Sequence, residues 1–164
     1  MLNVNSVVDI AIIIKDGIMK SHNIEPENQT DLTKLKISRR LNQIVRLCIF
    51  IELYRQDNAT PFEPLLERKA LHHAMHTLFG IDPLKAEQYQ LSDIVVLFHS
   101  QIKNLQLSGS VKDFITELDE RVEYFTSVTK SLWRVTAPEY RYMNGYYWDE
   151  FPIEEAHRIL GERL

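Results

Sequence analysis

The densest group of side chains that could do chemistry lies between residues 67 and 76. It holds one carboxylate, one guanidinium and three imidazoles: Glu67, Arg68, His72, His73 and His76. Two imidazoles four residues apart share one helix face, so His72 and His76 could bind a divalent ion, with a carboxylate such as Glu67 or another His completing the shell. Neither a Glu beside the first His nor a Cys pair accompanies them. Two interpretations stay open: a metal pair, or two histidines that flank the core with ordinary partners.

Arg68 and His73 offer a second chemistry. They enclose the sequence RKALHH, which resembles the Arg-x4-6-His motif of HEPN ribonucleases, small helical-bundle proteins whose dimers cleave RNA without a metal. The resemblance implies that His73 is the acid–base group and that Arg68 stabilises the phosphate charge. One branch of the family has Tyr two residues after the His, where this chain has Met75. On an ideal helix the two side chains are about 140° apart, so a shared site requires a dimer or a helix irregularity.

Aromatic residues crowd the segment from residue 133 to 151. Tyr and Trp supply large contact area with a polar handle and are enriched at binding hot spots. They surround Asn144 and Gly145, a dipeptide favoured in tight hairpin turns, so we expect a small β-hairpin or an aromatic loop. This segment either covers the bundle as a lid or binds a partner. The candidate binding residues are Tyr140, Tyr142, Tyr146, Tyr147 and Trp148.

An acidic run is a weaker candidate for a metal-binding face. Its members are Glu117, Asp119, Glu120 and Glu123. A solvated helix surface explains them equally well, and no second acidic helix supplies further ligands. The chain also lacks a P-loop, GxGxxG, GxSxG, zinc-type Cys pair or kinase signature. We therefore expect no cofactor, and the common enzyme classes are disfavoured.

Basic residues are concentrated between residues 34 and 55, and acidic residues between 139 and 164. The basic stretch could contact nucleic-acid phosphates through Arg39, Arg40 and Arg46, or these residues could form the solvated edge of an apolar helix. A net charge of −4 argues against a nucleic-acid binder. The two stretches can pair, either within one molecule or between two.

The periodicity of apolar residues predicts helices over residues 6–21, 32–56, 60–79, 92–105, 110–132 and 153–163. The second is apolar almost all round, which is typical of the central helix of a bundle. Thr60, Pro61 and Glu63 supply an N-cap, a first-turn proline and an N3 acid, so the third helix is expected to begin there and to end at Gly80. Arg68 falls within its apolar arc, which predicts an inward Arg that needs a partner.

Length and composition fit one domain over residues 1–164, since 45% of the residues are hydrophobic and Cys48 has no disulfide partner. The fold expected is an all-α, up-and-down bundle of about five helices with a small aromatic hairpin or loop and a short C-terminal helix. The N-terminus lacks a signal peptide and no apolar run spans a bilayer, so we expect a cytoplasmic protein.

The leading functional hypothesis is a non-catalytic, regulatory interaction protein. It would bind a protein partner through the aromatic C-terminal region and form a homodimer. The alternative is the HEPN-like ribonuclease built on Arg68 and His73.

Overall fold

The computed structural model describes residues 2–27, 29–129 and 145–161, and this part of the chain is helical with no strand. It contains eight α-helices, so the all-α prediction is confirmed, whereas the expected count of about five is too low. One short 3-10 helix, η3 (Trp148–Glu150), precedes the last of them. The α-helices are α1 (Val4–Ser21), α2 (Asp31–Asn58), α3 (Lys69–Phe79), α4 (Pro83–Ala86), α5 (Leu91–Leu97), α6 (His99–Lys103), α7 (Gly109–Thr129) and α8 (Ile153–Gly161).

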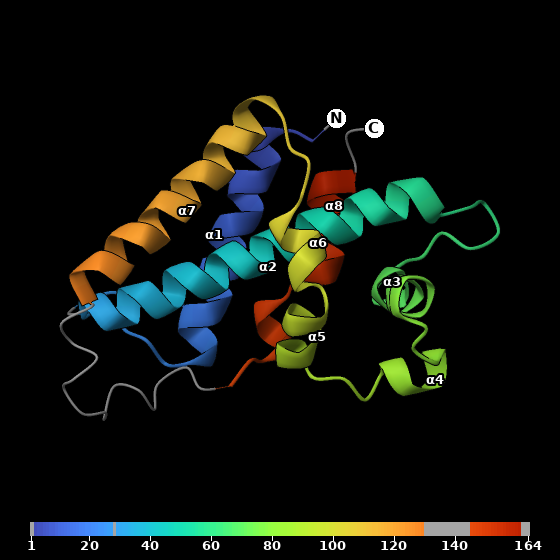
Figure 1. Ribbon diagram of the computed structural model, residues 1–164, viewed down its shortest axis with the longest axis horizontal. Coiled ribbons are helices and arrows are strands. Elements are labelled where there is room, and N and C mark those ends of the chain that lie inside the picture. The colour runs from blue at the N-terminus through green and yellow to red at the C-terminus, as the bar shows by residue number, and fades with distance from the viewer. Residues whose placement is uncertain (1, 28, 130–144, 162–164) are drawn as a thin grey trace.

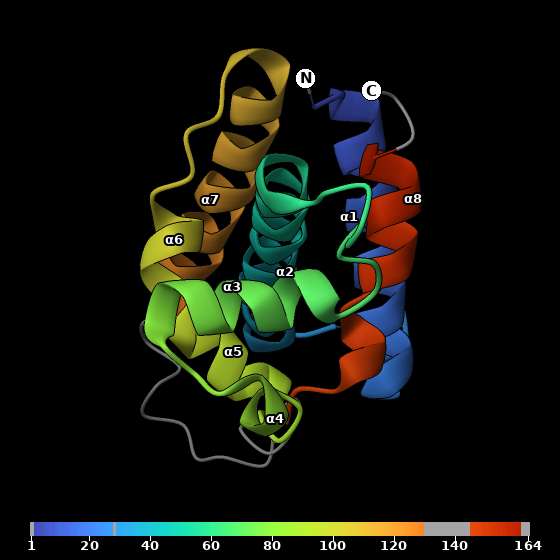
Figure 2. The same ribbon diagram turned by 90° about the vertical axis from the view of Figure 1, so that its right-hand side faces the viewer.

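Helix α2 is the central element, as its apolar sequence predicts. It contacts α1, α3, α5, α6, α7 and α8 (Figures 1 and 2). Its residues Ile44, Val45 and Leu47 have no exposed surface. The long helices α1 and α7 pack along one part of α2, and the short helices α3 to α6 gather beside the other. No helix in the described ranges is long and apolar enough to cross a membrane.

The third predicted helix begins at Lys69 and not at Thr60, so that prediction is wrong at its N-terminus. The Thr60 hydroxyl accepts a hydrogen bond from the Glu63 amide at 3.1 Å, but the bond closes only an isolated turn. Pro64 explains the difference, because it has no N–H to donate and disfavours helical backbone at the residue before it. The C-terminal end is confirmed, since Gly80 has a φ of 66° and caps α3.

The loop between α2 and α3 is fixed by the buried side chain of Arg55. Its Nε donates to the Leu65 carbonyl at 2.9 Å and its Nη2 to the Glu67 carbonyl at 3.4 Å. Both acceptor residues have a φ of 52°, a conformation that costs a non-glycine residue about 1–2 kcal/mol. Arg55 also pairs with Glu52, and Oε2 of Glu52 lies 3.1 Å from Nδ1 of His157. These contacts tie the loop and α8 to the central helix.

The helix predicted over residues 92–105 is broken at Phe98 into α5 and α6. The Phe98 ring has no exposed surface, and its centroid lies 5.4 Å from that of Phe50 and 5.2 Å from that of Phe79. The break turns the chain so that this ring enters the core between two others, and packing therefore overrides the continuous helical pattern.

We expect Arg55→Met to destabilise the fold by about 3–5 kcal/mol, because it leaves the Glu52 carboxylate buried without its cation and two loop carbonyls without a donor. Urea unfolding followed by circular dichroism measures the change. Arg39→Met is the matched control, since Arg39 is exposed on the same helix, and it should stay within about 0.5 kcal/mol of the parent. Equal stability of the two variants would show that Arg55 does not hold the loop.

Candidate functional site

A groove of about 890 Å³ lies where the start of α3 faces η3 and the start of α8. We call it the acidic groove, because five carboxylates but only two full cations line it among the described residues. Its lining residues are Glu67, Arg68, Lys69, His72, Glu87, Trp148, Asp149, Phe151, Pro152, Ile153, Glu154 and Glu155. The four apolar members come from one stretch of chain, so the groove combines an apolar wall with a surplus of negative charge.

Arg68 reaches across the acidic groove to an aromatic ring. It is the N-cap residue of α3 and is exposed, so the prediction of an inward Arg is wrong. The reason is the late start of the helix, which takes Arg68 out of the apolar arc. The partner is Trp148, whose ring centroid lies 3.8 Å from Cζ of Arg68, within the range of a cation–π contact.

A buried ionic cluster positions the aromatic side of the groove. Glu150 is the last residue of η3 and has no exposed surface. Its Oε1 accepts from Nη1 of Arg40 at 3.2 Å and also contacts the ring of His22, while Nη1 of Arg40 lies 2.6 Å from His22 Nε2. Arg40 is only 5% exposed, so it is not part of a solvated helix edge. The basic stretch and the acidic tail therefore pair within one molecule here.

Helix α1 approaches η3 closely at Gly17. A Cβ atom added to Gly17 would lie 3.1 Å from the Asp149 carbonyl oxygen, tighter than an ordinary van der Waals contact. The absence of a side chain at this position thus lets η3 lie against α1. This contact and the Glu150 cluster together fix the position of Trp148 in the wall of the groove.

His72 lines the groove as a largely neutral imidazole. Partial burial lowers its pKa below the ordinary 6.5, and the nearby Arg68 guanidinium acts in the same direction, whereas Glu87 opposes both. At neutral pH His72 therefore adds little positive charge to balance the carboxylates.

His73 lies outside the groove that Arg68 lines. Its Nδ1 is 2.7 Å from the Tyr54 hydroxyl, and its ring is exposed. Within one chain the two residues of the Arg-x4-His pattern therefore have separate surroundings. The ribonuclease alternative thus depends on its predicted dimer.

The histidine pair proposed for a metal is also divided. His72 faces the groove, while Nδ1 of His76 donates to the Ile81 carbonyl at 3.0 Å. Among the residues that the structure describes, no group of three or more His, Cys, Asp or Glu side chains is placed to hold a metal ion.

Among the aromatic candidates, Tyr146 packs on the central helix as a cover, whereas Trp148 lines the groove. The Tyr146 hydroxyl donates to Gln43 Oε1 at 2.8 Å, and Arg40 Cζ lies 3.9 Å from the Tyr146 ring centroid. The Tyr147 ring is 52% exposed and packs beside His22. Tyr140, Tyr142 and Asn144 lie outside the described residues, as does most of the expected hairpin.

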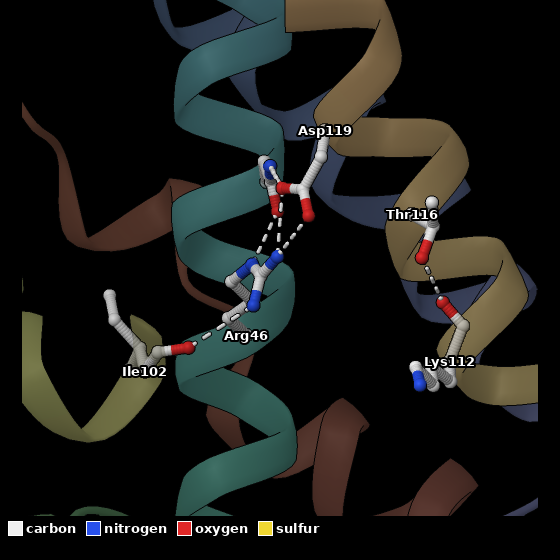
Figure 3. A network of polar contacts seen from close by, with 6 residues as sticks. Arg46, Ile102, Lys112, Thr116 and Asp119 are labelled. Carbon is white, nitrogen blue, oxygen red and sulfur yellow. Dashed lines mark hydrogen bonds and ion pairs between the residues drawn. The ribbon is translucent and has the colours of Figure 1, made fainter. Parts of the chain in front are cut away.

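Figure 3 shows that one member of the acidic run has a structural role. Both carboxylate oxygens of Asp119 accept from Nη2 of Arg46 at 2.7 Å, and Oδ1 also accepts from Asn42. Nη1 of Arg46 donates to the Ile102 carbonyl at 3.3 Å. Asp119 and Arg46 therefore join α7 and α6 to α2, which accounts for both residues without a metal or a phosphate.

We expect the free energy of unfolding to fall below about pH 6.5 partly because of His22. Burial lowers the pKa of His22 below the ordinary 6.5, and this outweighs the opposing contact with Glu150. The unfolded chain then binds the proton more readily than the folded chain, so acid favours unfolding and the full stability is present above that pH. Urea unfolding between pH 5 and 8 should show a shallower acid loss for His22→Gln. An identical pH slope in both proteins would contradict this assignment.

No protein-family model, curated protein or solved structure matches this chain.

Proposed function

We propose that this chain is a non-catalytic interaction protein that binds a basic segment of a protein partner in the acidic groove. The observation that carries the proposal is the guanidinium of Arg68, seated 3.8 Å from the Trp148 ring centroid amid surplus carboxylates. The chain itself thus displays an arginine bound on this surface. A partner's Arg or Lys would use the same chemistry, namely an aromatic face and nearby negative charge.

Most of the carboxylates in the groove are not paired with any described residue. Four of its carboxylates have no side-chain hydrogen bond or ion pair with any described residue: Glu67, Glu87, Asp149 and Glu154. The fifth, Glu155, is bound by Arg158. One of the two cations, Lys69, is itself paired with Glu63 at 3.2 Å. The unpaired charge is therefore strongly negative, which favours a cationic ligand and repels an acidic one.

Both sides of the groove are built on buried residues, which favours recognition of a partner without large rearrangement. Behind Arg68, the first turn of α3 is anchored by Ala70 and Leu71, which have no exposed surface. Behind Trp148, Glu150 has none and Phe151 is 3% exposed. A site held in this way loses little conformational entropy on binding, so more of the contact energy appears as affinity.

We expect a fluorescein-labelled peptide with alternating Arg and Gly to bind the protein at low salt, and the matched peptide with Gln in place of Arg not to bind. Trp148→Ala should weaken binding roughly tenfold, because it removes the aromatic face. Glu87→Gln should weaken it severalfold and flatten the salt dependence. Fluorescence anisotropy measures the affinities.

Glu117→Gln is the matched control for charge, since Glu117 is an exposed acid on α7 and does not line the groove. It should bind the peptide like the parent. Thermal unfolding of each variant separates a lost contact from a lost fold. Equal binding of the Arg and Gln peptides, or an equal effect of Glu87→Gln and Glu117→Gln, would reject the groove as the binding site.

The ribonuclease alternative has one observation in its favour: the Tyr54 hydroxyl orients the exposed His73 ring at 2.7 Å, as acid–base work requires. Our proposal predicts that the protein and His73→Ala leave a labelled RNA equally intact. Gel analysis of the RNA after long incubation checks this. Cleavage that disappears with both His73→Ala and Arg68→Gln would replace the interaction protein with the enzyme.

A further inference from the structure

A second pocket, of about 230 Å³, lies among α1, α2 and α7, which contact one another in the long-helix part of the molecule (Figure 1). Three of its lining residues are cations, one from each helix: Lys15, Lys34 and Arg121. Among the residues that the structure describes, no carboxylate lines it. In a chain with a net charge of −4, this is a local reversal of charge.

No described residue neutralises any of the three cations. In the described ranges, the side chains of Lys15, Lys34 and Arg121 make no hydrogen bond and no ion pair. Two less exposed arginines of α2, Arg40 and Arg46, are by contrast paired with carboxylates. Like charges gathered around a small pocket repel one another, and an anion between them removes that cost.

The remainder of the pocket is suited to an apolar body with a polar attachment. Ile37 and Leu41 are 4% and 5% exposed and line it from α2, and the half-buried Phe125 ring lines it from α7. Ser38 also lines it, is 7% exposed, and has no side-chain hydrogen bond with any described residue. With no described partner, the Ser38 hydroxyl can donate a hydrogen bond to an acceptor placed beside the three cations.

We propose that this pocket binds a small organic phosphate monoester with an apolar body. A phosphate monoester carries nearly two negative charges and three acceptor oxygens at neutral pH, which matches two ammonium groups, one guanidinium and one hydroxyl. The planar guanidinium of Arg121 pairs with two phosphate oxygens, and the lysines act as point charges. The volume admits a ligand of one ring or a short chain, below the usual range for drug-sized molecules.

Isothermal titration with phenyl phosphate tests the proposal on the full chain. Phenyl phosphate should bind at least tenfold more tightly than phenol, which lacks the charge, and more tightly than inorganic phosphate, which lacks the ring. Its affinity should fall as the salt concentration rises. Phenol binding as tightly as phenyl phosphate, or no heat from phenyl phosphate at low salt, would overturn the proposal. If inorganic phosphate bound as tightly as phenyl phosphate, the proposal that the ligand has an apolar body would be rejected.

Variants locate the site. Arg121→Gln should weaken phenyl phosphate binding by roughly tenfold or more, because a charge-assisted bidentate contact is lost. Lys112→Gln is the matched control, since Lys112 is exposed on the same helix and does not line the pocket, and it should bind like the parent. Trp148→Ala should also bind phenyl phosphate normally, so failure of this site is distinguishable from failure of the acidic groove. Equal weakening by Arg121→Gln and Lys112→Gln would overturn the assignment.

Discussion

The structure depends on the neutralisation of charges buried on its central helix. Arg40, Glu52 and Arg55 of α2 are 5%, 2% and 4% exposed, and an unpaired ion at such depth costs several kcal/mol. Only the Glu52–Arg55 pair lies within α2. Arg40 forms an ion pair with Glu150, which lies 110 residues further along the chain. Glu52 also contacts His157 on α8. The C-terminal segment must therefore return to α2 before the core charges are satisfied.

This requirement places both sides of the acidic groove. Arg40 holds η3 through Glu150, which sets the position of Trp148. Arg55 holds the preceding loop through the Leu65 and Glu67 carbonyls, which sets where α3 begins and hence where Arg68 stands. The cation–π contact across the groove thus joins two elements that are each positioned by a buried arginine of the same helix. Loss of either arginine therefore displaces the backbone segment that it holds and, with it, one side of the groove at the surface.

Local patterns predicted the parts of the fold that local interactions decide. The periodicity of apolar residues was sufficient to predict α1, α2, α7 and α8. Gly80 was sufficient to predict where α3 ends. The start of α3 could not be read from the Thr60 capping residues, because Pro64 and the long-range bonds of Arg55 decide it. The break at Phe98 follows from ring packing across helices.

The candidate site was predictable only in part. Trp148 and Arg68 both stand out in the sequence, Trp148 as one of a cluster of aromatic residues and Arg68 as a charge beside histidines, but no local pattern pairs the two. Glu150 was missed because one acid in an acidic tail looks solvated until Arg40 is known to be buried. Opposite charges in the basic stretch and the tail were the available clue, and they indicated pairing without naming the residues.

Arg68 has a double effect on recognition in the groove. While Arg68 rests on Trp148, a partner's arginine gains that aromatic contact only by displacing Arg68 or by using another part of the ring, so the lost Arg68 contact offsets part of what the ring contributes to affinity. Discrimination then comes mainly from the carboxylates that Arg68 leaves unpaired. A ligand with a single positive charge competes with a cation that is already tethered at high effective concentration, whereas a segment with several charges does not depend on that one position. The geometry therefore selects for extended basic segments over isolated cations.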